Sequence, residues 1–146
     1  MNRAPAVLLA CVLLVGGCGP TKTLTASPTD LASARARWAA VGPDAYTMTL
    51  SRSCFCPEEY RGPYRVSVQG GTVTRVEMND QTLPADRALS VEALFALLED
   101  ATARPAERID VTYDARLGYP TSVAIDYDAR IADEEVAYTV RDLTAE

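Results

Sequence analysis

The stretch from Tyr46 to Pro57 reads Tyr-Thr-Met-Thr-Leu-Ser-Arg-Ser-Cys-Phe-Cys-Pro. Its apolar side chains at positions 46, 48 and 50 alternate with hydroxyl side chains at 47, 49 and 51, and this period of two is typical of a half-buried strand. Pro57 lacks a backbone N–H, so it limits strand pairing just past the end of the stretch. The pattern therefore predicts a strand that leads two cysteines, Cys54 and Cys56, into a loop.

The same alternation predicts five further strands, in residues 64–69, 72–78, 109–114, 123–127 and 136–141. Gly70-Gly71 permits the positive backbone angles of a tight turn, so the first two of these segments are expected to form a hairpin. In the second segment, Thr74, Val76 and Met78 are expected on one face. Residues 79–89 are expected to be a loop.

Two segments carry helical periodicity. Asp30 is placed to cap a helix that ends at Gly42-Pro43, and Ser90 is placed to cap a second helix over residues 91–100. The expected buried stripes are Leu31, Ala34, Trp38 and Val41 in the first helix, and Val91, Leu94, Phe95 and Leu98 in the second. Trp38 is interpreted as a core anchor rather than as a stacking surface for a ligand.

Consecutive strands with short turns favour antiparallel pairing, and the helices are available to cover the single apolar face of each strand. We therefore expect an α+β fold with a six-stranded antiparallel sheet, two helices on one face, and the element order αβββαβββ. The opposite face is expected to be wet or to bind a ligand. Its candidate binding residues are Thr47, Thr49, Arg65, Ser67, Arg75, Thr112 and Thr139.

Composition excludes several classes of function. The chain has 146 residues, which favours one domain, and its 14 basic and 20 acidic residues give a net charge of -6, which disfavours nucleic acid as a partner. It contains no histidine, which excludes Ser-His-Asp and Cys-His catalysis and removes the commonest transition-metal ligand. An acidic turn at residues 126–135 has Arg130 where a calcium loop needs an oxygen ligand. We expect that the protein is not an enzyme and that it has no cofactor and no metal site.

The first eighteen residues are typical of a bacterial export signal. Arg3 precedes an apolar segment at residues 6–15, which is shorter than the ~20 residues that a membrane-spanning helix needs. Val15-Gly16-Gly17-Cys18 resembles a lipobox. The resemblance implies cleavage after Gly17, a diacylglyceryl thioether on Cys18, and acylation of the new amino group with a chain such as palmitate.

The expected organisation is a signal peptide at 1–17, a lipidated cysteine and flexible tether at 18–29, and a single domain at 30–146. Two or three acyl chains hold a protein stably on a membrane. The expected location is therefore the cell envelope: the outer membrane in a bacterium with two membranes, as Gly19 implies, and otherwise the outer face of the plasma membrane.

With Cys11 removed and Cys18 lipidated, Cys54 and Cys56 remain as a pair. Exported thiols this close are usually oxidised, but α-carbons two residues apart in a strand lie ~6.5 Å apart, near the upper limit for a disulfide, so the backbone must bend. Three interpretations stay open: a local disulfide that shapes the loop, a thiol-exchange pair, and a Cu(I) site that adds Met48.

The sequence also resembles a family of small bacterial lipoproteins and secreted proteins that is catalogued as a domain of unknown function. The resemblance covers about residues 30–143. The residues that carry it are Trp38, Tyr46, Cys54-Phe55-Cys56, Val66, Val68, Gly70-Gly71, Leu94-Phe95, Tyr113-Asp114, Gly118-Tyr119-Pro120 and Ile125-Asp126. It implies export and this fold, and it supplies no catalytic residue.

The sequence thus predicts a membrane-anchored, non-enzymatic module that binds an envelope protein or ligand on its exposed sheet face. The alternative is a thiol-redox or Cu(I)-handling lipoprotein that uses Cys54 and Cys56.

Overall fold

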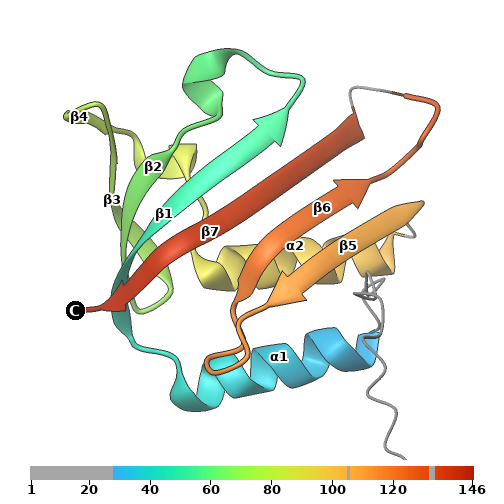
Figure 1. Cartoon of the computed structure of the whole chain (residues 1–146), viewed down its shortest axis with the longest axis horizontal. Coiled ribbons are helices and arrows are strands. Elements are labelled where there is room, and N and C mark those ends of the chain that lie inside the picture. The colour runs from blue at the N-terminus through green and yellow to red at the C-terminus, as the bar shows by residue number, and fades with distance from the viewer. Residues whose placement is uncertain (1–27, 105, 132–133) are drawn as a thin grey trace, which may run out of the picture.

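The computed structural model describes residues 28–104, 106–131 and 134–146. Within these residues the chain forms one antiparallel sheet and two α-helices, so the predicted α+β class is confirmed (Figure 1). The elements are α1 (Pro28–Val41), β1 (Ala45–Cys54), η1 (Glu58–Tyr60), β2 (Tyr64–Gln69), β3 (Thr72–Met78), β4 (Gln81–Leu83), η2 (Ala85–Arg87), α2 (Val91–Ala103), β5 (Arg108–Tyr113), β6 (Pro120–Asp126) and β7 (Glu135–Ala145).

The described sheet has seven strands, so the prediction of six strands in the order αβββαβββ is wrong. The additional strand is β4, which pairs with β3 inside the segment that was expected to be a loop, and the element order becomes αββββαβββ. The turn between β3 and β4 is made by Asn79 and Asp80, whose φ angles are 50° and 62°. Asn and Asp tolerate this left-handed conformation, which two-residue hairpin turns require.

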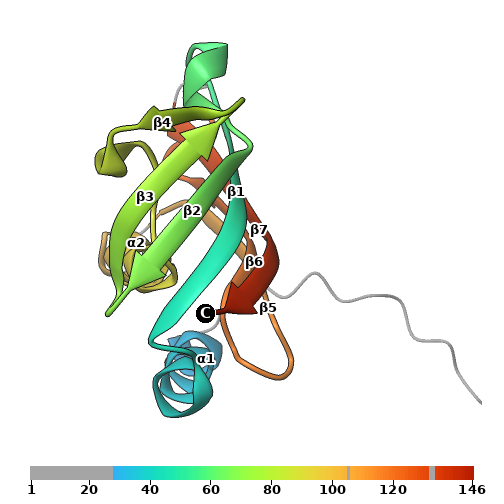
Figure 2. The same ribbon diagram turned by 90° about the vertical axis from the view of Figure 1, so that its left-hand side faces the viewer.

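The spatial order of the strands is β4-β3-β2-β1-β7-β6-β5. Two runs of consecutive strands, β1 to β4 and β5 to β7, are therefore joined through the pairing of β1 with β7. In that pair Leu50 lies opposite Val140 and Cys54 lies opposite Val136. Figure 2 shows the twist of the sheet from β3 through β1 to β7.

The core lies on one face of the sheet. On β1, Tyr46, Met48 and Leu50 are buried, as their alternation predicts. Helix α2 lies behind the strands in Figure 1, and α1 lies beside α2. The predicted stripe of α2 is confirmed, since Val91, Leu94, Phe95 and Leu98 are all buried.

On β3 the predicted face is partly wrong. The register between β2 and β3 shifts after Ser67, so Val73 rather than Thr74 lies opposite Val68. Thr74 is consequently exposed, and Val73 packs against the core.

The ends of the helices agree with the sequence analysis in part. Ser90 caps α2, because its Oγ accepts a hydrogen bond of 3.2 Å from the backbone N–H of Ala93. Helix α1 begins at Pro28, before the predicted cap at Asp30; proline suits the first helical position because its missing N–H is not needed there. Val41 ends α1 and is 56% exposed, so it does not extend the buried stripe of Leu31, Ala34 and Trp38.

A hydrogen-bond network around Tyr46 connects β1 with both helices. The hydroxyl of Tyr46 accepts from the backbone N–H of Val91 at 2.8 Å and donates to Glu92 Oε2 at 2.9 Å. The indole Nε1 of Trp38 donates to Glu92 Oε1 at 2.8 Å. Because the first N–H groups of a helix have no partner within it, the Tyr46 hydroxyl supplies one that Val91 needs.

Gly118 explains why the turn between β5 and β6 contains Gly-Tyr-Pro. Its φ is +85°, and a Cβ at this position would lie 2.6 Å from the carbonyl oxygen of Ala34 in α1. Only glycine avoids both the backbone strain and the contact. Tyr119 then packs edge-to-face against Trp38, with ring centroids 5.9 Å apart.

The Tyr46 network leads to a prediction that compares two tyrosines. We expect Tyr46→Phe to lower the free energy of unfolding by about 1–3 kcal/mol, because it leaves the buried N–H of Val91 without a partner. The Tyr113 hydroxyl is buried and has no hydrogen-bond partner among the described residues. Tyr113→Phe is therefore expected to leave stability unchanged or to raise it. Urea unfolding of both variants checks this, and an equal loss in both would contradict the role assigned to Tyr46.

A second prediction concerns alkaline pH. Burial raises the pKa of Tyr46, and it raises the pKa of Tyr113 to about 12. The folded chain therefore keeps protons that the unfolded chain releases above about pH 10. The free energy of unfolding has its full value below that pH and decreases as the pH rises above it. We expect this fall in denaturant titrations between about pH 10 and about pH 12, with a shallower slope for Tyr113→Phe. A flat profile would contradict it.

Candidate functional site

The open face of the sheet presents rows of polar side chains across β1, β2 and β3. Directly opposed residues of antiparallel strands point to the same face. The register places Thr47 opposite Ser67 and Ser67 opposite Arg75, and it places Thr49 opposite Arg65. Five of the seven predicted binding residues therefore lie side by side on three neighbouring strands.

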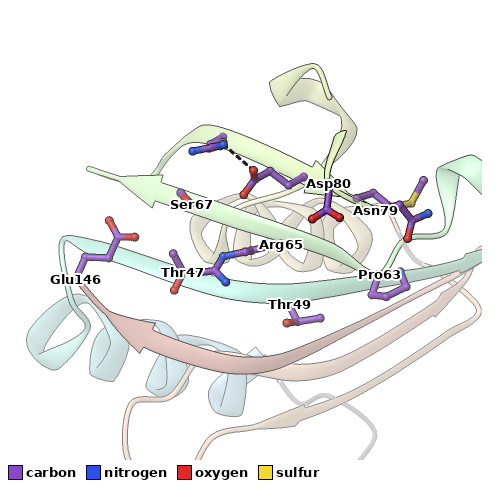
Figure 3. Close-up of a pocket in the computed structure, with 11 residues that line it drawn as sticks. Thr47, Thr49, Pro63, Arg65, Ser67, Asn79, Asp80 and Glu146 are labelled. Carbon is purple, nitrogen blue, oxygen red and sulfur yellow. Dashed lines mark ion pairs between the residues drawn. The ribbon is translucent and has the colours of Figure 1, made fainter. Parts of the chain in front are cut away.

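These five residues line an open groove of about 660 Å³ (Figure 3). The groove has a polar floor because its strands turn their apolar side chains to the opposite face. In Figure 3, Arg65 lies between Glu146 on one side and Asp80 on the other. The complete lining is Thr47, Thr49, Pro63, Arg65, Ser67, Arg75, Glu77, Met78, Asn79, Asp80 and Glu146.

The two arginines of the groove differ in their ion pairing. Arg75 forms an ion pair of 2.6 Å with Glu77. Arg65 is exposed and makes no ion pair with any described residue. Its guanidinium thus keeps its donors for a ligand, and the hydroxyls of Thr47 and Ser67 lie on the same face beside it. The groove has the chemistry to bind an anionic group at its centre.

Thr112 and Thr139 lie on the same open face but outside the groove. Thr112 is opposite Ser122, Ser122 is opposite Thr139, and Thr139 is opposite Ser51. This row of hydroxyls crosses β5, β6, β7 and β1. The Oγ1 of Thr112 is also 2.9 Å from the Oγ1 of Thr121. The structure therefore divides the predicted binding face into a groove and a flat row.

Several groove residues were missed by the sequence analysis. Glu77 had an available signal, because it is two positions after Arg75 in the same strand. Asn79 and Asp80 were assigned to a loop, yet their turn forms the rim. Glu146 has no sequence signal, because it reaches the groove only through the pairing of β7 with β1, where its backbone N–H donates to Ala45 O at 3.0 Å.

The two cysteines lie where the sequence places them, at the end of β1. Their sulfur atoms are in close contact, and their α-carbons are 5.2 Å apart, closer than in an extended strand. The predicted bend of the backbone is therefore present. Met48, the third ligand in the copper hypothesis, has its side chain buried in the core and is six positions before Cys54 on the strand, about 20 Å away.

Trp38 and the acidic turn both form contacts within the protein. Trp38 is buried, with its ring edge-to-face against Tyr46, as expected of a core anchor. Asp128 forms an ion pair of 2.8 Å with Arg130, and hydrogen bonds from Arg130 lower the pKa of that carboxyl. Across the described residues there is no group of three or more Cys, Asp or Glu side chains placed to hold a metal ion.

The predicted signal peptide, Cys18 and residues 19–27 of the predicted tether lie outside the described residues. In the part of the chain that is described, neither helix has the length and apolar character to cross a bilayer.

Comparison with known proteins identifies a family and no individual relative. Neither the curated proteins nor the solved structures include a match to the chain. A family model, described as a family of unknown function (DUF6174), matches residues 30–145, which include most of α1, all of α2, the cysteine pair and every groove residue except Glu146. The chain therefore belongs to the family of unknown function DUF6174.

Proposed function

We propose that this protein is a lipid-anchored, non-enzymatic binding module of the bacterial cell envelope, and that its ligand lies in the groove on the open face of β1, β2 and β3. The observation that carries the proposal is the convergence of Thr47, Thr49, Arg65 and Ser67 on one concave, polar surface. Hydrogen-bond donors on rigid strands hold their positions before a ligand arrives, which favours binding.

The ligand is expected to present an anionic group to Arg65. A guanidinium without an ion pair gains most from a carboxylate or phosphate, which it contacts with two parallel hydrogen bonds. The carboxylates of Asp80 and Glu146 on either side suit basic groups that flank this anion. A polypeptide with mixed charge meets both requirements, so the favoured ligand is a protein.

The membrane anchor rests on the first eighteen residues. Their charge, the length of their apolar segment and the Val-Gly-Gly-Cys motif all agree with a lipoprotein signal. The proposed anchor is Cys18, and the proposed location is the outer membrane of a two-membrane bacterium or the outer face of a single plasma membrane.

The close contact of Cys54 and Cys56 is proposed to be a structural disulfide in the exported protein. Glu58 and Glu59 follow after Pro57, and two carboxylates near a thiol disfavour the thiolate that exchange or Cu(I) binding needs. The disulfide proposal therefore stands ahead of the thiol-redox and copper-handling alternatives.

A pair of threonine variants tests the groove. We expect Thr49→Arg to block it by bulk and charge and to reduce the recovery of a specific envelope protein on the immobilised domain by at least about tenfold. Thr112→Arg is the matched control, since it places the same side chain on the same face outside the groove, and we expect it to bind like the wild type. Quantitative mass spectrometry of the proteins retained from solubilised envelopes makes the comparison.

If both variants retain the same proteins as the wild type, the groove is not the binding site. If Thr112→Arg alone loses binding, the flat row of hydroxyls is the site instead. Thr49 is half-buried and Thr112 is exposed on the sheet surface. The melting temperatures of both variants are therefore expected to agree with that of the wild type within a few degrees.

The intact mass of the protein extracted from membranes tests the anchor and the cysteine pair together. We expect a chain that starts at Cys18, carries two or three acyl chains, and lacks two hydrogens between Cys54 and Cys56. Cys18→Ser is expected to abolish labelling by radioactive palmitate and to retain the leader. An unmodified chain that begins at Met1 would contradict the anchor, and two free thiols in that mass would contradict the disulfide.

A further inference from the structure

The helix side of the sheet is not buried along the whole length of β1 and β7. On this face Leu50 lies opposite Val140, and the two side chains are 1% and 4% exposed. The next pair on the same face is Arg52 opposite Tyr138, and both of these side chains are only half-buried. In Figure 1 the end of β1 and the start of β7 extend beyond α2. The cover that the helices give the sheet therefore stops before the ends of these two strands.

A further pair of half-buried residues lies beside Arg52 and Tyr138. Cys54 is opposite Val136 in the pairing of β1 with β7, and Val136 is also opposite the buried Ile125 of β6. Side chains two positions apart on a strand point to the same face, so both pairs lie on the helix side of the sheet. We refer to Arg52, Cys54, Val136 and Tyr138 as the arginine corner.

Arg52 carries the one charge of the arginine corner, and the described chain supplies no counterion for it. Its Nε is buried and has no hydrogen-bond partner, and its guanidinium forms no ion pair with a described residue. A buried donor without a partner and a partly desolvated charge without a counterion both reduce the stability of the folded state. Proteins retain groups of this kind where binding a ligand needs them.

Tyr138 holds the guanidinium in place. The Arg52 Cζ lies 5.8 Å from the centroid of the Tyr138 ring, within the range of a cation–π contact. Burial raises the pKa of the Tyr138 hydroxyl, and the charge of Arg52 acts in the opposite direction, so the two groups also interact electrostatically. The backbone N–H of Arg52 donates to Arg61 O at 2.7 Å, which fixes the end of the strand. The guanidinium is thus positioned before a ligand arrives.

The other charged residues near this end of the sheet do not neutralise Arg52. Arg61 follows η1, is exposed, and adds a second positive charge. Arg104 follows α2, but its guanidinium is already paired with Asp100. Solvent screens exposed charges more strongly than a half-buried one, so the positive charge of Arg52 dominates at the corner itself. The nearby acidic residues are all exposed and form no ion pair with Arg52; they are Glu58, Glu59 and Glu134.

We propose that the arginine corner binds a small organic monocarboxylate, with the carboxylate on the guanidinium of Arg52 and the apolar body of the ligand against Val136 and the Tyr138 ring. A guanidinium binds a carboxylate through charge-assisted hydrogen bonds. One positive charge balances one negative charge, and half-buried apolar neighbours oppose a second. A monocarboxylate therefore fits better than a phosphate monoester, which carries about 1.5 to 2 negative charges at neutral pH.

This site is separate from the groove. The groove lies on the open face of β1, β2 and β3, whereas the arginine corner lies on the helix side of β1 and β7. Binding at the corner therefore requires neither the groove nor the membrane anchor.

Nuclear magnetic resonance of the full-length protein, carrying isotopically labelled arginine and purified in a nonionic detergent, tests the site directly. The Nε–H signal of Arg52 is assigned by its loss in Arg52→Met. We expect benzoate to shift this signal with a dissociation constant of about 1–10 mM, the range open to a ligand of this size. Benzamide has the same shape without the charge and should leave the signal in place. Phenyl phosphate should bind more weakly than benzoate.

Replacing Arg52 separates a binding role from a structural one. Arg52→Met keeps the apolar stem and removes the unpaired charge. We expect its melting temperature to equal or exceed that of the wild type, and its affinity for benzoate to fall at least about tenfold. Arg141→Met is the matched control, because Arg141 is exposed and lies opposite Thr49 on the open face of the sheet. This control should bind benzoate like the wild type.

Four results would overturn the proposal. They are a benzoate titration of the wild type that leaves the Arg52 signal in place, an equal shift with benzamide, tighter binding of phenyl phosphate than of benzoate, and an equal loss of benzoate binding in the two methionine variants. A melting temperature of Arg52→Met several degrees below that of the wild type would assign the arginine to the fold and would also count against a charge held for a ligand.

Discussion

The structure depends on the pairing of β1 with β7, which joins the two halves of the chain. The neighbours of β1 are β2 from the first half and β7 from the second, so the sheet is continuous through this pairing. One face of β1 is buried under the helices, and this one-sided burial sets the register, because a shift by one residue would expose Tyr46, Met48 and Leu50. The same alternation turns Thr47 and Thr49 to the open face, where the groove lies.

Tyr46 connects this strand to the helices by hydrogen bonds as well as by packing. Its hydroxyl completes the first turn of α2 at Val91, and through Glu92 it reaches Trp38 of α1. Each buried polar group in this network has a partner, so the network fixes how the helices sit on the sheet without the cost of an unpaired group. A rigid floor for the groove follows from this arrangement.

The groove presents its polar groups from three neighbouring strands, β1, β2 and β3. It offers the hydroxyls of Thr47, Thr49 and Ser67 beside the guanidinium of Arg65, which forms no ion pair with a described residue.

The sequence by itself determined six of the seven strands in the described chain, both helices and most of the polarity of each face. Alternation at residues 46–51, the cap at Ser90 and the pair Gly70-Gly71 are local signals, because each depends on the backbone and its immediate neighbours. Only the tertiary structure decided which residues meet. The pairing of β7 with β1 brings Glu146 to the groove, and the Asn79-Asp80 turn adds β4 and the rim of the groove. These contacts join residues far apart in the chain, and no local pattern encodes which strands become neighbours.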